Sequence, residues 1–136
     1  MLQNTETKRL FFDTMVLAAG SFALQPDYEL LFNYPAAKFT NEYAVKEYRH
    51  VLAKQGSLPH DTENALAEIR KNVKILPSPQ KHEFEKIVIT DKSDRPIVCS
   101  AMKANCILVT NDRRTYREAQ KYVAVKTPKE ILQERN

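Results

Sequence analysis

Four acidic residues are spaced through the chain in a way that could build one site: Asp13, Glu47, Asp94 and Asp112. Carboxylates gathered in one place repel one another, so such a cluster is stable only if it is protonated or neutralised by cations. Hard oxygen ligands favour Mg²⁺ or Mn²⁺, and these ions activate water and stabilise the charge that develops on a phosphodiester. The pattern therefore indicates metal-assisted hydrolysis, provided that the fold brings the four acids together.

The strands that would position these acids are short apolar segments. We expect strands over Arg9 to Phe12, Ala37 to Thr40, Cys106 to Thr110 and Tyr122 to Lys126. Lys86 to Thr90 is either a further short strand or an extended approach to an acidic turn. Two of the four acids directly follow predicted strands, and the carboxyl ends of parallel strands share one rim of a sheet. Those two acids therefore belong on the same rim.

Helical patterns separate the predicted strands. Strands that alternate with helices imply a mostly parallel sheet covered on both faces, which is a three-layer α/β/α sandwich. The piece from Pro77 to Glu85 is predicted to be an exposed loop, because it combines two prolines with mixed charge. The expected helices cover about 14–20, 27–33, 41–56, 59–76, 95–105, 113–121 and 128–134.

Glu47 is placed by the apolar pattern of its own helix. Apolar residues recur there at helical spacing, so one face of the helix is predicted to pack on the sheet. Glu47 lies beside Tyr48 and one turn before Val51. It is therefore at the margin of the apolar face, an unusual place for an acid that is merely solvated.

Each acid also has a simpler interpretation. Asp13 and Asp94 could serve only as helix caps, and Asp112 could cap the basic helix that follows it. Glu47 taken alone could be a solvated helix residue. Asp91 is close enough to Asp94 in the sequence to compete with it as the third acid of the site.

Length and composition suit a single domain that spans residues 1–136. The formal net charge of +4 is compatible with nucleic-acid binding but does not establish it. No signal peptide or membrane span is evident, so we expect a cytoplasmic protein without membrane association. Cys99 and Cys106 lie in apolar runs without metal-ligand spacing, which favours core packing.

The sequence resembles the PIN-domain family, and within it the toxin-like (VapC-like) small ribonucleases of toxin-antitoxin pairs. The segments FFDTMVL and NEYAVKEYRHVL resemble the family's first two motifs, and DRPIVCSAMKANCILVTND resembles the third and fourth. VAVKTPKEIL resembles the closing strand and its Pro-initiated helix. The resemblance implies a metal-dependent endoribonuclease that cleaves single-stranded or structured RNA, and it is compatible with the toxin of a toxin-antitoxin pair, whose partner would be an antitoxin protein.

Carried over by position, the resemblance implies that Asp13, Glu47, Asp94 and Asp112 are catalytic and bind one or two Mg²⁺ or Mn²⁺ ions. Thr110 would support the last acid, or a water on the metal, through its hydroxyl group; alternatively it is only a strand-end threonine.

The chain departs from the family pattern at two places. Met15 replaces a residue that is usually small and polar, most often Asn. Many relatives carry another acid two or three residues after the one at Asp112, where this chain has Arg113, Arg114 and Thr115. These departures favour an alternative in which a catalytically weakened PIN-like domain binds RNA or a protein.

Basic residues follow the last two acids in the sequence. Their guanidinium groups could hold RNA phosphates and make binding salt-dependent, although they could equally be ordinary surface cations. The arginines predicted to contact RNA are Arg95, Arg113, Arg114 and Arg117.

Two other enzyme or signalling classes receive little support. His50, His60 and His82 lie apart, so none is assigned a role, and the chain has no Ser/His/Asp or Cys/His pattern for covalent hydrolysis. VAVKTP superficially resembles a turn of receiver domains, but a receiver would need an acidic pair near its first strand, where Asp13 stands alone. A homodimer is a further expectation, with the apolar residues Phe22, Leu24, Tyr28 or Phe32 as its contact.

Overall fold

A parallel five-stranded sheet forms the centre of the protein, for which a computed structural model describes residues 7–134. The strand order is β3-β2-β1-β4-β5, and every neighbouring pair is parallel. The carboxyl ends of all five strands therefore lie at one edge of the sheet. The strands are β1 (Arg9–Phe12), β2 (Ala37–Asn41), β3 (Lys74–Leu76), β4 (Ile107–Val109) and β5 (Val125–Lys126).

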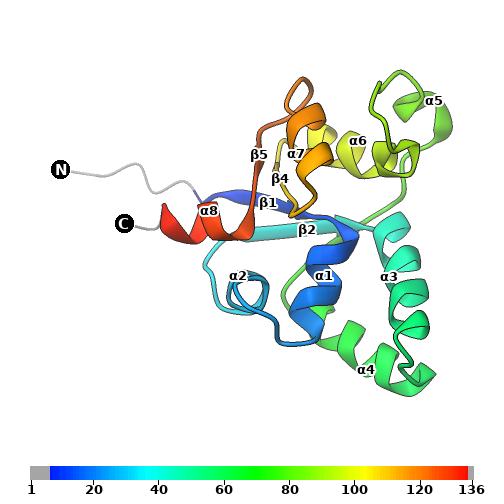
Figure 1. The fold of residues 1–136 in the computed structure, drawn as a ribbon, viewed down its shortest axis with the longest axis vertical. Helices are drawn as coiled ribbons and strands as arrows, with labels where there is room; N and C mark the ends of the chain where they lie inside the picture. Colours follow the sequence, from blue (N-terminus) through cyan, green and yellow to red (C-terminus); the bar gives the residue numbers. More distant parts are fainter. Residues whose placement is uncertain (1–6, 135–136) are drawn as a thin grey trace.

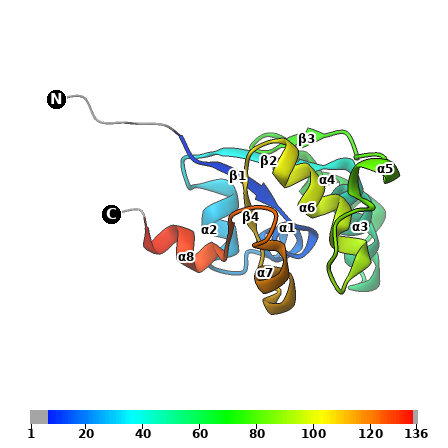
Figure 2. The ribbon, with the colours of Figure 1, turned by 90° about the horizontal axis from the view of Figure 1, so that it is seen from above.

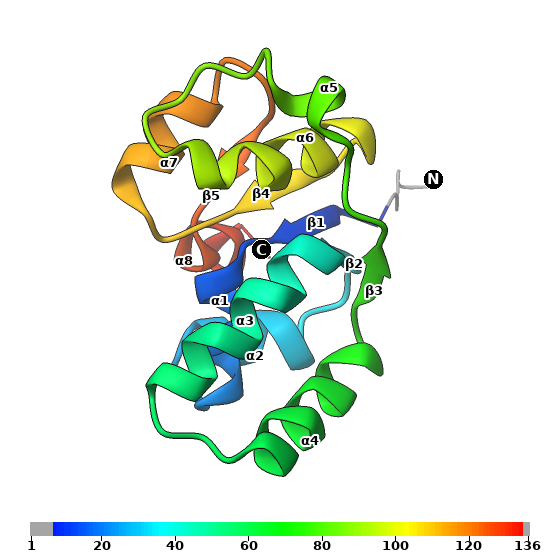
Figure 3. The same ribbon diagram turned by 90° about the vertical axis from the view of Figure 1, so that its right-hand side faces the viewer.

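Helices cover both faces of the sheet, which confirms the predicted three-layer α/β/α sandwich. One face carries α1 to α4 and the other carries α6 and α7 (Figures 1 and 3). Helix α8 packs beside α2 (Figure 2). Within residues 7–134, no helix is long and apolar enough to cross a membrane. The helices are α1 (Thr14–Ser21), α2 (Asp27–Phe32), α3 (Glu42–Lys54), α4 (Pro59–Arg70), α5 (Lys81–Phe84), η1 (Lys92–Asp94), α6 (Arg95–Lys103), α7 (Arg113–Ala119) and α8 (Pro128–Gln133).

The central strand β1 explains the position of the first acid. Leu10, Phe11 and Phe12 have no exposed surface, as expected for a strand covered on both faces. The backbone N–H of Asp13 donates to the carbonyl of Val109 at 3.2 Å, which continues the pairing of β1 with β4 by one residue. Asp13 is thereby fixed at the rim of the sheet.

The edge strand β3 was not predicted. Its residues follow the apolar stripe of α4 directly and were interpreted as the end of that stripe. In the structure Lys74, Ile75 and Leu76 pair with the carboxyl half of β2. A three-residue strand gives too short a pattern for strand periodicity to show in the sequence.

The predicted loop from Pro77 to Glu85 contains the single helical turn α5. A capping box stabilises this turn: the Gln80 side chain accepts from the backbone of Glu83, and the Glu83 side chain accepts from the backbone N–H of Gln80. The exposed-loop prediction was therefore wrong for these four residues.

Lys86 to Thr90 is not a strand, so the second interpretation of this segment, an extended approach to the acidic turn, holds. Its backbone is satisfied by side chains near α7. The hydroxyl of Tyr122 accepts from the N–H of Val88, and the carboxylate of Glu118 accepts from the N–H and hydroxyl of Thr90. The apolar pattern of the segment reflects its two buried isoleucines.

Candidate active site

The four predicted acids line one cavity. It has a volume of about 320 Å³, and its lining residues lie at or just before the starts of α1, α6 and α7 and on one face of α3. Figure 3 shows how these helices are arranged around the sheet. Asp13, Glu47, Asp94 and Asp112 come from four separate parts of the chain. Asp91, the competing third acid, also lines the cavity. The fold therefore brings together every acid that the sequence nominated, while their chemical roles stay predictions.

Asp13 is the most perturbed of these acids. It caps α1, with its Oδ1 accepting from the backbone N–H of Val16 at 3.0 Å. Burial raises the pKa of Asp13 to about 7, and the charges of Asp94 and Asp27 act in the same direction. Hydrogen bonds from Thr110 and Val16 oppose the shift without cancelling it. In the absence of a cation, this carboxyl group is thus partly protonated at neutral pH.

Asp94 shows a similar but smaller perturbation. Burial raises its pKa to about 6, assisted by the negative charges of Asp91, Glu47 and Asp112. The hydroxyl of Thr115 donates to Oδ2 of Asp94 at 2.8 Å and opposes the shift. The alternative interpretation of Asp94 as only a helix cap is not supported by its contacts, because its side chain makes no capping hydrogen bond to α6.

Glu47 is held by two hydroxyl groups rather than by solvent alone. Thr14 donates to its Oε1 at 2.9 Å, and the hydroxyl of Tyr43 donates to its Oε2 at 3.3 Å. Burial raises the pKa of Tyr43 to about 12, and the charges of Glu47, Asp94 and Asp91 contribute. The phenol therefore remains a proton donor to Glu47 throughout the physiological pH range.

Asp112 is the most open of the four acids and caps α7. Its Oδ1 accepts from the backbone N–H of Thr115 at 2.8 Å, so the predicted capping role is present. Its own N–H donates to the hydroxyl oxygen of Thr110 at 3.1 Å. Since the Thr110 side chain also hydrogen-bonds with Asp13, the threonine connects the first and last acids of the cluster. The hydroxyl of Thr110 thus contacts the backbone of Asp112, and its support of that acid's side chain or of a water on the metal stays a prediction.

The donors suit a hard divalent cation, although the ligands do not converge on one point. Buried carboxylates with raised pKa values gain stability when a cation replaces the proton. Among residues 7–134, no three His, Cys, Asp or Glu side chains are arranged to hold one ion together. An ion would therefore bind through fewer of these carboxylates, or after their side chains rotate. Asp13, Glu47, Asp94 and Asp112 are the residues that would hold it.

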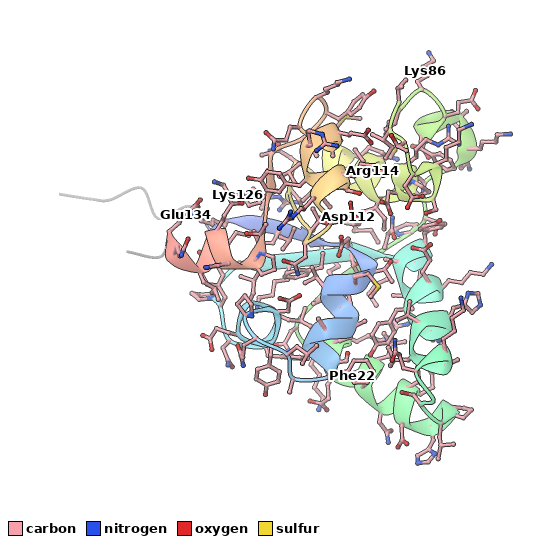
Figure 4. All side chains as sticks on the ribbon, in the orientation of Figure 1. Phe22, Lys86, Asp112, Arg114, Lys126 and Glu134 are labelled. Atoms are coloured by element: carbon pink, nitrogen blue, oxygen red, sulfur yellow. The ribbon has the colours of Figure 1, made fainter. Side chains whose placement is uncertain are left out.

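The predicted RNA-binding arginines occupy different environments. The guanidinium group of Arg95 donates to the carbonyls of Lys92 and Glu85, each at 3.3 Å, and lies over the ring of Phe84. Its contacts thus hold the segment before α6, and it does not line the cavity. The arginines of α7, which are Arg113, Arg114 and Arg117, are exposed; Figure 4 shows Arg114 near Asp112 at the start of that helix.

Two basic residues that the sequence did not nominate line the cavity. They are His50 and Lys54, which lie on α3 together with Glu47 and Val51. Their spacing after Glu47 is three and seven residues, so a helix places them on the same face. That spacing was visible in the sequence, but only the structure shows which exposed face of α3 lines the cavity with the acids.

A buried acid, Asp27, also escaped the sequence analysis. It is 4% exposed, and its Oδ2 accepts from the side-chain amide of Asn111 at 3.0 Å. Burial raises the pKa of Asp27, and its charge contributes to the raised pKa of Asp13. In the sequence it was visible only as the first residue of a helix.

Acids gathered at the carboxyl edge of an open parallel sheet define an α/β protein with a candidate hydrolase site. The chain belongs to the PIN domain family, whose family model matches residues 13–134. PIN domains are generally nucleases. No curated protein matches the sequence of this chain.

Solved structures show the same fold at low sequence identity. VapBC2 from Rickettsia felis, bound to a DNA fragment from its promoter, has a TM-score of 0.67 and 16% identity, with 88% of this chain and 98% of that chain covered. FitAcB from Neisseria gonorrhoeae has a TM-score of 0.63 and 20% identity, covering 88% and 97%. A toxin-antitoxin complex from Klebsiella pneumoniae has a TM-score of 0.63 and 16% identity, also covering 88% and 97%.

Proposed function

We propose that this PIN domain is a metal-dependent endoribonuclease that cleaves phosphodiester bonds of single-stranded or structured RNA with Mg²⁺ or Mn²⁺. The observation that carries the proposal is the single cavity lined by Asp13, Glu47, Asp94 and Asp112. Four acids from separate parts of the chain would not be gathered at such an electrostatic cost for packing alone.

The four acids would hold the cation, and the remaining residues would fix the acids. A divalent ion bound there would lower the pKa of a water molecule and stabilise the negative charge that develops on the phosphodiester during cleavage. Thr14 and Tyr43 keep Glu47 in place, and Thr115 keeps Asp94 in place. The exposed arginines at the start of α7 would draw the RNA backbone toward Asp112.

The experiment that tests this function is cleavage of a mixed single-stranded RNA pool. Wild-type protein and Asp13→Asn/Asp112→Asn are compared in Mn²⁺, Mg²⁺ and EDTA. Asp61→Asn is the matched control, because Asp61 is an exposed acid in the first turn of α4, outside the cavity. We expect cleavage by the wild type and the control only with metal, and none by the double variant. Absence of metal-dependent cleavage by pure wild-type protein would remove the proposal.

A second candidate function is a catalytically weakened PIN domain that binds RNA or a protein. Two observations favour it: the side chain of Met15 lines the cavity and is 56% exposed, and no three ligands converge within residues 7–134. RNA binding that persists in EDTA, with no cleavage under any condition, would support this alternative.

The proposed partners follow from the family and from the compared structures. Several of those structures are toxin-antitoxin complexes, so we propose that this chain is the toxin of such a pair, acting in the cytoplasm with an antitoxin protein. A homodimer through the predicted apolar patch is also proposed. Phe22, Leu24 and Tyr28 are 45%, 56% and 37% exposed, and the ring of Tyr28 contacts Phe32.

A further inference from the structure

One wall of the acidic cavity differs from the rest in its chemistry. Helix α3 presents Glu47, His50, Val51 and Lys54 to the cavity, at positions i, i+3, i+4 and i+7 of one helical face. Met15 from α1 also lines the cavity. Beyond Glu47, this side of the cavity therefore carries two nitrogen bases and two apolar side chains but no further acid.

The two basic side chains of this wall form no ion pairs within the part of the protein that the structure describes. His50 and Lys54 are both exposed, and within residues 7–134 neither forms an ion pair with a carboxylate. By contrast, Arg49 of the same helix forms an ion pair with Glu63 at 2.9 Å. A lysine beside an acidic cavity, free of a carboxylate partner, is available to an anion that enters the cavity.

The two apolar residues of the wall, Met15 and Val51, line a cavity that is otherwise mostly polar. Met15 is 56% exposed and lies two residues after Asp13 in the sequence. Val51 is half-buried beside it in the same cavity. An exposed thioether and an isopropyl group offer a surface on which a planar base can pack, and methionine adapts its shape to such a partner.

We propose that this wall, made by Met15, His50, Val51 and Lys54, binds one nucleotide that flanks the cleaved phosphodiester. The phosphate of that nucleotide contacts His50 and Lys54, and its base packs on Met15 and Val51. The proposal rests on the proposed ribonuclease function and assigns its substrate contacts. The positive charge of Lys54 offsets the repulsion between an RNA phosphate and the neighbouring carboxylates, and the arginines of α7 contact the RNA beyond the acids.

The phosphate contact is tested by RNA binding rather than by cleavage. The full chain is titrated in EDTA against a short labelled single-stranded RNA at several salt concentrations. Lys54→Gln should bind several-fold more weakly, and its slope of log affinity against log salt should be smaller by about 1. Lys46→Gln is the matched control, because Lys46 is exposed on the same helix but does not line the cavity. It should bind like the wild type.

The base contact is tested with a second probe. The same length of ribose-phosphate chain, made without bases, is compared with the intact RNA. Met15→Gln keeps the length of the side chain but removes its apolar character, so it should weaken binding of the intact RNA and leave binding of the abasic chain unchanged. Lys54→Gln should weaken binding of both probes, since both carry phosphates.

The outcomes separate this inference from the ribonuclease function. If the wild type cleaves RNA but Lys54→Gln and Lys46→Gln bind alike, the subsite is wrong and the function stands. If the expected pattern of binding appears without any cleavage, the subsite stands and the function fails. Absence of RNA binding by the wild type, or an equal effect of Met15→Gln on both probes, would also overturn the corresponding contact.

Discussion

Thr115 joins two acids of the cavity that lie on different segments. Its hydroxyl donates to Oδ2 of Asp94 at 2.8 Å, and its backbone N–H donates to Oδ1 of Asp112 at 2.8 Å. The residue is 5% exposed, so neither bond competes with much water. The hydrogen bond from Thr115 stabilises the charged form of Asp94.

Thr115→Val should show what the hydroxyl contact to Asp94 contributes, because the backbone contact to Asp112 remains. Valine keeps the shape and the N–H to Asp112 but removes the donor to Asp94, so the pKa of Asp94 should rise above its present value of about 6. The acid limb of the pH-rate profile should move to higher pH, and the free energy of unfolding should fall by about 1 kcal/mol. Thr115→Ser, which keeps a hydroxyl, should restore the profile. A profile that is identical for the valine variant and the wild type would contradict this role.

Asp13 should make the fold less stable as the pH rises. Its pKa is raised from the ordinary 3.8 to about 7, so between these values the folded state binds more protons than the unfolded state. The contribution of Asp13 to the free energy of unfolding therefore declines from about pH 4 to pH 7 and is level above that. The decline is at most about 4 kcal/mol, at about 1.4 kcal/mol per pKa unit. Asp13→Asn retains a helix cap and should lose most of this slope.

Urea unfolding at a series of pH values in EDTA would measure the effect. The wild type and Asp61→Asn should lose stability together as the pH rises toward 7, whereas Asp13→Asn should be the more stable protein at pH 8. If the free energy of unfolding changed equally with pH in Asp13→Asn and in the wild type, the carboxyl group of Asp13 would not be the cause of the pH dependence.

Much of the site follows from a rule about strand ends, which is why the sequence predicted it. Asp13 and Asp112 each come after an apolar strand, and parallel strands bring such residues to one rim. Glu47 could be found because it stands at the edge of an apolar helix face. His50 and Lys54 could not, because an exposed residue beside a cavity and one facing bulk solvent follow the same sequence pattern.

The parts of the fold that were missed or left open are short or stabilised from a distance. The pairing of β3 with β2 involves only three residues, and α5 depends on a capping box of a single turn. The extended shape of Lys86 to Thr90 is set by hydrogen bonds to Tyr122 and Glu118, which are about 30 residues away in sequence. Local periodicity carries no information about such partners.

A divalent cation should stabilise the protein through the acid cluster. In EDTA at pH 8, Asp13 and Asp94 are charged and repel their neighbours; a cation bound to the folded state removes this repulsion. At a Mn²⁺ concentration one hundred times its dissociation constant, the free energy of unfolding should increase by about 2.7 kcal/mol. Asp13→Asn/Asp94→Asn should lose the increase, and Asp61→Asn should keep it. The same melting temperature in EDTA and in Mn²⁺ for the wild type would argue against a metal site.

The apolar patch of Phe22, Leu24, Tyr28 and Phe32 should hold two copies of the chain together. Leu24 is 56% exposed, and Figure 4 shows Phe22 at the far end of α1 from the acids. Exposed apolar side chains that lie together are typical of interaction sites, and here the ring of Tyr28 contacts that of Phe32. Sedimentation at high protein concentration should give a dimer for the wild type and a monomer for Leu24→Ser. Val88→Ser is the control, because Val88 is 72% exposed but lies outside the patch, and it should remain dimeric. A wild-type chain that stays monomeric would contradict the predicted dimer.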